Sequence, residues 1–434
     1  MTRLWFATIV CVIGLGLIVH ANIAQANIED ILYEKGQITK EEWLKTKADH
    51  EKEEAIIQER ATIKKWYDKI SIRGYTQIRY SYLTGENNLV SEYDSSIGNN
   101  KGFLIRRARL VISGDITDWL SIYIQPEFAG TTGDGSNNFA QLRDAYADIF
   151  LTKDKEWRIR GGQSKVPFGF ETLQSSQQRL PFDRSDGINS AVNGERDLGF
   201  FLYYTPVETR KVFKSLVEKG LKGSGDYGVL GVGVYNGQTI NVSERNDEKH
   251  VVLHATYPFE LPYGQIVQVG ADAYRGIINV NCAAPLVVTA GACSPASALA
   301  KGNINDERVG VHFVLYPQPF GLQAEWNWGR GPELNAAQTA LQEGSLQGGY
   351  VQAMYKWDDA IPYIRWQEYN GGKKHRTNSP FNVVRELEVG LEYQFGKALE
   401  LTVAYVWTKR TDTQTAPYPI RDGEILRTQL QWNF

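Results

Sequence analysis

Arginines two residues apart recur in the early part of the chain, and their chemistry suits the binding of anions. Arg107 and Arg109 lie in the segment FLIRRARL, and Arg158 and Arg160 lie in the segment WRIRG. Residues two apart in an extended chain share one face. A guanidinium group donates paired hydrogen bonds to phosphate or carboxylate oxygens, so this spacing predicts a row of anion-binding groups.

Two further stretches extend the basic pattern. Arg73 and Arg79 share one face of an earlier extended segment, whereas Arg106 falls on the opposite face unless a β-bulge re-aims it. The segment 164–196 adds four basic residues: Lys165, Arg179, Arg184 and Arg196. These four either face passing anions or pair with acidic neighbours and fix the segment in place. The acidic neighbours are Glu171, Asp183, Asp186, Glu195 and Asp197.

The remaining motifs do not form a recognisable catalytic site. GSGDYG, at Gly223–Gly228, fits the glycine pattern of a dinucleotide site. It follows an expected helix and precedes an expected strand, which is the reverse of the order that such a site requires. No nucleophile and base form a recognisable pair. We therefore expect neither an enzyme nor a cofactor.

Cys282 and Cys293 are expected to form a disulfide. Ten residues separate them in NCAAPLVVTAGAC. Neighbouring thiols usually pair in an oxidising compartment, and two thiols with no histidine nearby supply only half of a tetrahedral zinc shell. No metal site is expected.

The chain begins with features of an export signal. Arg3 precedes an apolar run from Leu4 to Val19, and the triplet Ala-Gln-Ala follows at 24–26. We expect residues 1–26 to be a cleaved signal peptide. The mature chain has a near balance of charge, since 47 basic and 50 acidic residues in the whole sequence give a net charge of -3. That balance argues against a nucleic-acid partner.

Residues 27–69 are expected to form a polar, helical periplasmic arm. Thr39 and Glu42 have the spacing of a capping box, which marks the start of a helix. Apolar residues are sparse here. The arm is therefore either a solvated spacer or a short coiled coil between subunits, although sustained heptads are missing.

From residue 70 onward the apolar period becomes two. In ELEVGLEYQF, Leu387 and Val389 share one face and Glu386 and Glu388 share the other. Many such runs have 10 to 13 residues, which suits a tilted strand that crosses a bilayer. About 16 runs separated by alternately short and long connections predict a 16-stranded antiparallel transmembrane β-barrel over residues 70–434, all-β except for the helical arm. At this size the lumen normally leaves an aqueous channel.

One connection departs from the short-turn pattern. The segment 206–225 should be a tight turn, yet VETRKVFKSLVEKG has the spacing of a small amphipathic helix. The late strands also carry acidic residues on the expected lumen face. These are Glu325, Glu386, Glu388, Glu392 and Glu400. Together with the early arginines they predict a transverse field and only weak anion selectivity.

Several motifs, taken in order, resemble the phosphate-selective porin O and P family. They are FLIRRARL at 103–110, LRDAY at 142–146, GQSKVPFGFE at 162–171, the serine pair at 175–176, FDRS at 182–185, ERDLG at 195–199, YNG at 235–237 and the C-terminal aromatic residue. The resemblance covers roughly residues 70–434. It implies a homotrimer of 16-stranded barrels in the bacterial outer membrane, each with basic residues around a narrowed pore. By the same resemblance, Arg107 and Lys165 match the basic constriction and Asp144 matches an acidic partner.

Sequence and resemblance together lead to one expectation with two alternatives. We expect an outer-membrane porin, surrounded by lipid, that passes small hydrophilic solutes and prefers anions such as phosphate. The alternatives are a non-selective general porin and a surface adhesin or structural barrel. The expected pore-lining or anion-binding residues are Lys165, Arg107, Arg109, Arg79, Arg73, Arg158, Arg160 and Asp144.

Overall fold

The computed structural model describes residues 28–62, 66–84, 102–131, 137–282, 302–414 and 416–434, and it divides the chain into two compact units, 1–65 and 66–434. The first unit contains helices α1 (Ile28–Glu34) and α2 (Lys40–Thr62). The expected capping box is confirmed, because the Thr39 N–H donates to the Glu42 carboxylate at 2.8 Å and the Glu42 N–H donates to the Thr39 hydroxyl at 3.3 Å. In the part of the chain described here, no helix is both long and apolar enough to span a membrane.

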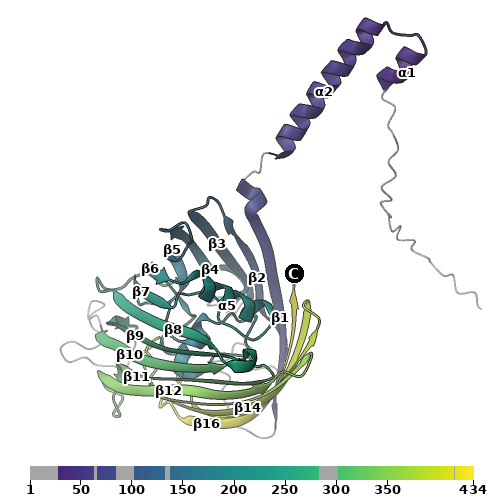
Figure 1. The fold of residues 1–434 in the computed structure, drawn as a ribbon. Helices are drawn as coiled ribbons and strands as arrows, with labels where there is room; N and C mark the ends of the chain where they lie inside the picture. Colours follow the sequence, from purple (N-terminus) through teal and green to yellow (C-terminus); the bar gives the residue numbers. More distant parts are fainter. Residues whose placement is uncertain (1–27, 63–65, 85–101, 132–136, 283–301, 415) are drawn as a thin grey trace, which may run out of the picture. The chain divides into compact units, whose positions relative to one another are not determined.

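The second unit is a closed barrel of 16 antiparallel strands, as predicted (Figure 1). A short 3-10 helix, η1 (Trp66–Lys69), precedes the first strand. Each strand pairs with its neighbours in sequence, and β1 pairs with β16 to close the ring. The strands are β1 (Ile70–Thr84), β2 (Phe103–Asp115), β3 (Leu120–Thr131), β4 (Asn137–Phe150), β5 (Trp157–Lys165), β6 (Arg196–Tyr204), β7 (Leu230–Tyr235), β8 (His250–Glu260), β9 (Ile266–Val280), β10 (Gly302–Leu315), β11 (Phe320–Leu334), β12 (Leu341–Tyr355), β13 (Ala360–Gly372), β14 (Phe381–Phe395), β15 (Leu399–Thr411) and β16 (Ile420–Asn433).

The polarity of the strands is inverted relative to a water-soluble sheet. On β14, Glu386, Glu388 and Glu392 are buried inside the barrel, whereas Leu387 and Val389 are exposed on its outer face. An apolar outer face and a polar interior are typical of a barrel whose solvent is lipid. Closure follows from the same physics, since hydrocarbon offers an unpaired strand edge no hydrogen-bond partner.

The last residue helps to close the ring. The Gly74 N–H donates to the Phe434 carbonyl at 2.9 Å, and the Phe434 N–H donates to the Gly74 carbonyl at 3.0 Å. The Phe434 ring lies against Gly74 so closely that a Cβ there would be 2.5 Å from the ring and 2.4 Å from the Arg109 carbonyl oxygen. The closing seam therefore requires glycine at position 74.

We expect Gly74→Ala to impair assembly, because the new methyl would push the last strand away from the first at a cost of about 1 to 3 kcal/mol. The measurement is the fraction of heat-modifiable barrel on unboiled gels. Gly310→Ala is the matched control, since a Cβ at that position would meet nothing nearer than 3.4 Å. Equal assembly of the two variants would contradict the steric argument.

Two connections occupy the barrel rather than its rim. The inner loop, residues 166–195 between β5 and β6, carries the short helices α3 (Phe170–Leu173) and α4 (Asp186–Asn189). The helical insertion, residues 205–229 between β6 and β7, carries α5 (Val207–Glu218), so the predicted helix is confirmed. The insertion leaves the end of the barrel where β1 begins and β16 ends, and the inner loop leaves the opposite end.

Candidate functional site

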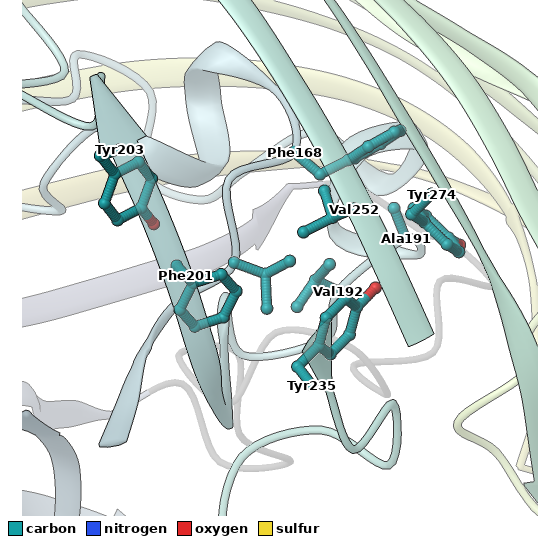
Figure 2. Packing of buried hydrophobic residues seen from close by; sticks show 9 residues of the cluster. Phe168, Ala191, Val192, Phe201, Tyr203, Tyr235, Val252 and Tyr274 are labelled. Atoms are coloured by element: carbon teal, nitrogen blue, oxygen red, sulfur yellow. The ribbon is translucent and has the colours of Figure 1, made fainter. Parts of the chain in front are cut away.

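The inner loop is attached to one wall of the lumen by a hydrophobic core. Figure 2 shows side chains of the loop packed among aromatic and aliphatic residues of the neighbouring strands. The loop supplies Val166, Phe168, Ala191 and Val192, and the wall supplies Phe201, Tyr203, Tyr235, Val252 and Tyr274. These side chains are at most 4% exposed. This wall of the lumen is therefore packed like the core of a soluble protein.

The loop then runs on to the adjoining strands β10 to β12, where α4 rests on β12. A Cβ on Gly187 would lie 2.6 Å from backbone atoms of both Gly348 and Gly349, so only glycine permits this approach. Two side chains of the wall hold the Gly187 carbonyl: the Asn327 amide donates to it at 2.9 Å, and the Arg308 guanidinium donates at 3.3 Å. The loop is thus fixed both to β6–β9 and to the adjoining strands β10–β12.

Between these attachments, the loop presents Asp183 to a group of four arginines. The Asp183 carboxylate lies 2.9 Å from the Arg79 guanidinium, 3.5 Å from that of Arg106, 3.7 Å from that of Arg107 and 2.8 Å from that of Arg427. We call Asp183 and these four residues the arginine cluster. Its members come from β1, β2, β16 and the inner loop, which a closed barrel brings together although the sequence separates them.

The arginine cluster is in contact with water. The side chains of Asp183 and Arg106 are 29% and 27% exposed, whereas those of Arg79, Arg107 and Arg427 are nearly buried behind them. Burial raises the pKa of the Asp183 carboxyl, but the charges of Arg79, Arg106 and Arg107 outweigh burial and hold that pKa below its usual value. Asp183 is therefore ionised, and four positive charges surround one negative charge.

A β-bulge explains how Arg106 joins the cluster. In the pairing of β1 with β2, Gln77 lies opposite Arg107, but the next residue, Ile78, lies opposite Ile105. Arg106 is the extra residue, and the bulge allows it to point inward together with Arg107. Strict alternation places Arg106 on the outer face. The structure instead has the β-bulge that the sequence analysis named as the condition for an inward Arg106.

The other predicted arginines lie on the lumen side but not in this cluster. Arg109 pairs with Glu127 at 2.5 Å and donates to the Tyr75 hydroxyl at 2.8 Å. On β5, Arg158 pairs with Asp226 at 2.9 Å and Arg160 pairs with Asp148 at 2.7 Å. These guanidinium groups are each matched by a nearby carboxylate, so they contribute less net charge to the lumen than the arginine cluster does.

Arg73 and Asp144 have different surroundings again. Arg73 is exposed and lies over the ring of Tyr123, at 5.9 Å from its centre. Asp144 is buried, and the Arg196 guanidinium donates to both of its carboxylate oxygens at 2.9 to 3.1 Å. Asp144 is thus paired with Arg196, the first residue of β6 after the inner loop.

Lys165 binds the inner loop through hydrogen bonds from its ammonium group. It is 5% exposed, and its ammonium group donates to the carbonyls of Leu173 and Gln174, both at 2.8 Å. Arg184 and Arg196 pair with Glu195 in the same region. For these three residues the structure has the arrangement in which basic side chains fix the segment rather than face a passing anion.

The acidic residues of the late strands are inside the barrel, and each has a donor nearby. Glu388 accepts from Arg365 at 3.5 Å and from the Tyr363 hydroxyl at 2.6 Å. Glu386 pairs with Arg410 at 2.8 Å. Glu392 pairs with Lys222 of the helical insertion, and Glu325 accepts the backbone N–H of Glu171 at 3.0 Å. Three of the five acids expected on this wall, Glu386, Glu388 and Glu392, are therefore compensated by basic side chains.

Of the arginine cluster, only Arg79 and Arg107 were among the expected pore-lining residues, and Arg427 was not considered at all. Its signal was present, because Arg427 shares a face of the last strand with Gln429 and Gln431, which are also buried in the barrel. What the sequence lacked was the register between β1 and β16. That register sets Arg79 opposite Gln429 and so brings Arg427 to the same Asp183.

The expected disulfide lies partly beyond the described residues. Cys282 is disulfide-bonded, whereas its expected partner, Cys293, lies outside the described ranges. Pairing of these two residues therefore stays a prediction. Mass spectrometry of protein purified without reductant should find a peptide that links Cys282 to Cys293, and two free thiols at these positions would contradict it.

Comparisons with known proteins agree with this architecture. A family model described as "Phosphate-selective porin O and P" matches residues 84–434. Among solved structures, the outer membrane channel DcaP of Acinetobacter baumannii is 15% identical with a TM-score of 0.52, and the match covers 84% of this chain and 97% of that one. OmpF of Salmonella typhi is 13% identical with a TM-score of 0.51, covering 84% and 97%. An anion-selective porin from Comamonas acidovorans is 10% identical with a TM-score of 0.50, covering 84% and 99%. At these identities the three structures establish the fold alone, and no curated protein matches the sequence.

Proposed function

This chain belongs to the phosphate-selective porin O and P family, and from that premise we propose that its channel prefers anions, phosphate among them, to cations. The protein is an outer-membrane porin of the bacterial envelope, a channel rather than an enzyme. The open question is what the channel selects. Its own residues bear on that question more directly than the family does.

The arginine cluster carries the proposal. Four guanidinium groups lie within 4 Å of one carboxylate, and two of the five side chains are more than a quarter exposed. A solute that passes the inner loop at this point meets a net positive charge. In a narrow lumen with low-dielectric walls, such a charge attracts anions and repels cations.

Phosphate is the anion whose geometry suits these groups best. Arg106 and Arg107 are adjacent in sequence and both turn toward Asp183 because of the bulge. Planar guanidinium groups donate in pairs to phosphate oxygens, and these charged hydrogen bonds replace part of the hydration that phosphate loses in a constriction. Chloride, a single atom, offers no matching pair of acceptors.

The paired acids of the late strands favour this proposal over a non-selective general porin. If Glu386, Glu388 and Glu392 faced the lumen without partners, their charge would oppose that of the arginines. Each of them is instead bonded to a basic side chain: Arg410, Arg365 and Lys222. A surface adhesin or structural barrel is the remaining alternative, and it would not conduct ions.

Several further assignments belong to the same proposal. Residues 1–26 are a signal peptide removed on export, and residues 27–69 form a periplasmic arm. The barrel assembles as a homotrimer, and its exposed apolar residues, such as Val309, Val311 and Leu391, face outer-membrane lipid. The protein has no catalytic activity.

The test is the reversal potential of purified channels in a planar bilayer under a salt gradient. Potassium chloride and potassium phosphate are compared at low ionic strength, where surface charges act over about 10 Å. We expect anion preference in both salts and a reduction of chloride current when phosphate is added. Clear cation preference would overturn the proposal while leaving the porin itself intact, and the absence of any current would favour the structural alternative.

A further inference from the structure

The helical insertion lies within the ring of strands rather than beneath it. α5 is an amphipathic helix whose Phe213 and Leu216 are 2% and 1% exposed. These two side chains pack against Ile266 and Val314 of the barrel wall. Figure 1 draws α5 inside the barrel, in agreement with these contacts.

The insertion also meets the inner loop. Phe170 of α3 belongs to the same hydrophobic cluster as Phe213, so the two connections, which enter from opposite ends of the barrel, touch inside it. The Gln174 side chain of the inner loop donates to the carbonyl of Lys222 at 2.7 Å. The insertion therefore has a fixed position relative to the constriction.

Beyond α5 the insertion reaches the opposite wall. Lys222 is 2% exposed, and its ammonium group pairs with the carboxylate of Glu392 on β14. In the ring of 16 strands, β14 lies seven strands from β7 and eight from β6, between which the insertion is connected. The Lys222–Glu392 pair therefore joins two opposite sides of the barrel.

We propose that the helical insertion is a transverse bar across the periplasmic half of the channel, that it limits the size of solutes that pass, and that Lys222 fixes its free side to Glu392. This inference concerns size, so it rests on the porin function and not on the proposed anion preference. The bar is attached to one wall by hydrophobic packing and to the other by one ion pair. It therefore divides the channel opening at this end of the barrel. A solute must pass beside it after passing the arginine cluster.

The physics of the pair makes it a sensitive position. Removal of one partner of a buried ion pair strongly destabilises the folded protein, because the remaining charge is left without compensation in a poorly solvated site. Reversal of either charge places two like charges together and should release the bar from β14. Reversal of both restores opposite charges at the same place.

The experiment uses the full-length porin with Lys222→Glu, Glu392→Lys and the double exchange. Liposome swelling with neutral sugars of increasing size reports the size limit, and neutral solutes keep the result independent of anion preference. Single-channel conductance is recorded in parallel. In each single variant, release of the helical insertion from β14 should raise the conductance about twofold and admit larger sugars, since the lumen of a 16-stranded barrel is wide enough for an aqueous channel. The double exchange should return both values toward those of the unmodified protein.

Lys219→Glu is the matched control, because Lys219 lies on the same insertion but is exposed. It should leave both values unchanged. If a charge reversal prevents assembly on unboiled gels, Lys222→Met removes the ion pair while keeping the side-chain volume, and its size limit is measured instead. A size limit that stays the same in assembled single variants, or one that the double exchange does not restore, overturns the inference.

Discussion

Arg106→Glu should shift the reversal potential of the channel strongly toward cations. The change replaces a four-to-one ratio of positive to negative groups in the arginine cluster by three-to-two. At about 5 Å in a water-like dielectric, one unit charge is worth roughly 0.8 kcal/mol, so a reversal is worth roughly 1.7 kcal/mol for each permeating ion. Before screening, that is about 15-fold against anions and about 15-fold in favour of cations. Arg106 suits the test because its side chain is partly exposed, so its reversal should disturb folding less than reversal of a buried neighbour.

Two further variants make the result specific. Arg275→Glu reverses an arginine whose side chain is 83% exposed on β9, away from the cluster, and should leave the reversal potential unchanged. Asp183→Asn removes the carboxylate at the centre of the cluster and should shift the potential in the opposite direction, toward anions. Because ionic strength screens these charges, all differences should shrink between 0.1 and 1 M salt, as the Debye length falls from about 10 to 3 Å. An Arg106→Glu channel with unaltered selectivity would remove this cluster from the permeation path.

The barrel could be predicted from sequence because its signal is local. Alternation of Leu387 with Glu386 and Glu388 requires only neighbours in the chain, and the inverted polarity follows from lipid being the solvent. Closure then follows from the need to pair every strand edge. The helix in the insertion was equally visible, since the 3.6-residue spacing of Phe213 and Leu216 is local too.

The site was harder to predict from the sequence than the barrel, because its contacts join residues that are far apart in the chain. Asp183 and Arg427 are 244 residues apart, and Lys222 and Glu392 are 170 apart. Spacing in the sequence says which face a residue occupies, but not where an inward loop will rest. The position of Lys165 shows the difference: the family resemblance assigns it to the constriction, whereas the fold of α3 brings the carbonyls of Leu173 and Gln174 over its ammonium group.

The bulge at Arg106 marks a second limit. One extra residue in β2 reverses the expected face of everything on one side of it, and this depends on the register with β1 rather than on β2 alone. The residue that alternation assigns to lipid is thus one of the two most exposed members of the arginine cluster. Here the departure from the local rule coincides with the place where the channel is expected to select.

Gly187→Ala should enlarge the pore and weaken its selectivity, because the inner loop can rest on β12 only without a side chain at this position. The added Cβ would lie 2.6 Å from backbone atoms of Gly348 and Gly349, and a strand backbone cannot move aside as the end of a flexible side chain can. The loop must therefore retreat, with a cost of about 1 to 3 kcal/mol for the forced repacking. It would also stretch the bonds from Asn327 to Gly187 and from Arg308 to the Ser190 hydroxyl, now 2.9 and 2.7 Å long.

The barrel itself should survive this change, since its wall is held by strand pairing that Gly187 does not share. We expect normal assembly, single-channel conductance raised about twofold as the lumen opens toward the width of an unobstructed 16-stranded barrel, and a reversal potential closer to zero because ions in a wider lumen pass farther from the arginines. Gly310→Ala again supplies the control, because the added methyl group would meet its neighbours only at ordinary van der Waals distances of 3.4 Å or more. If Gly187→Ala channels assemble with unchanged conductance and selectivity, the inner loop is not what narrows this pore, and the arginine cluster then acts as a structural clamp rather than as a filter.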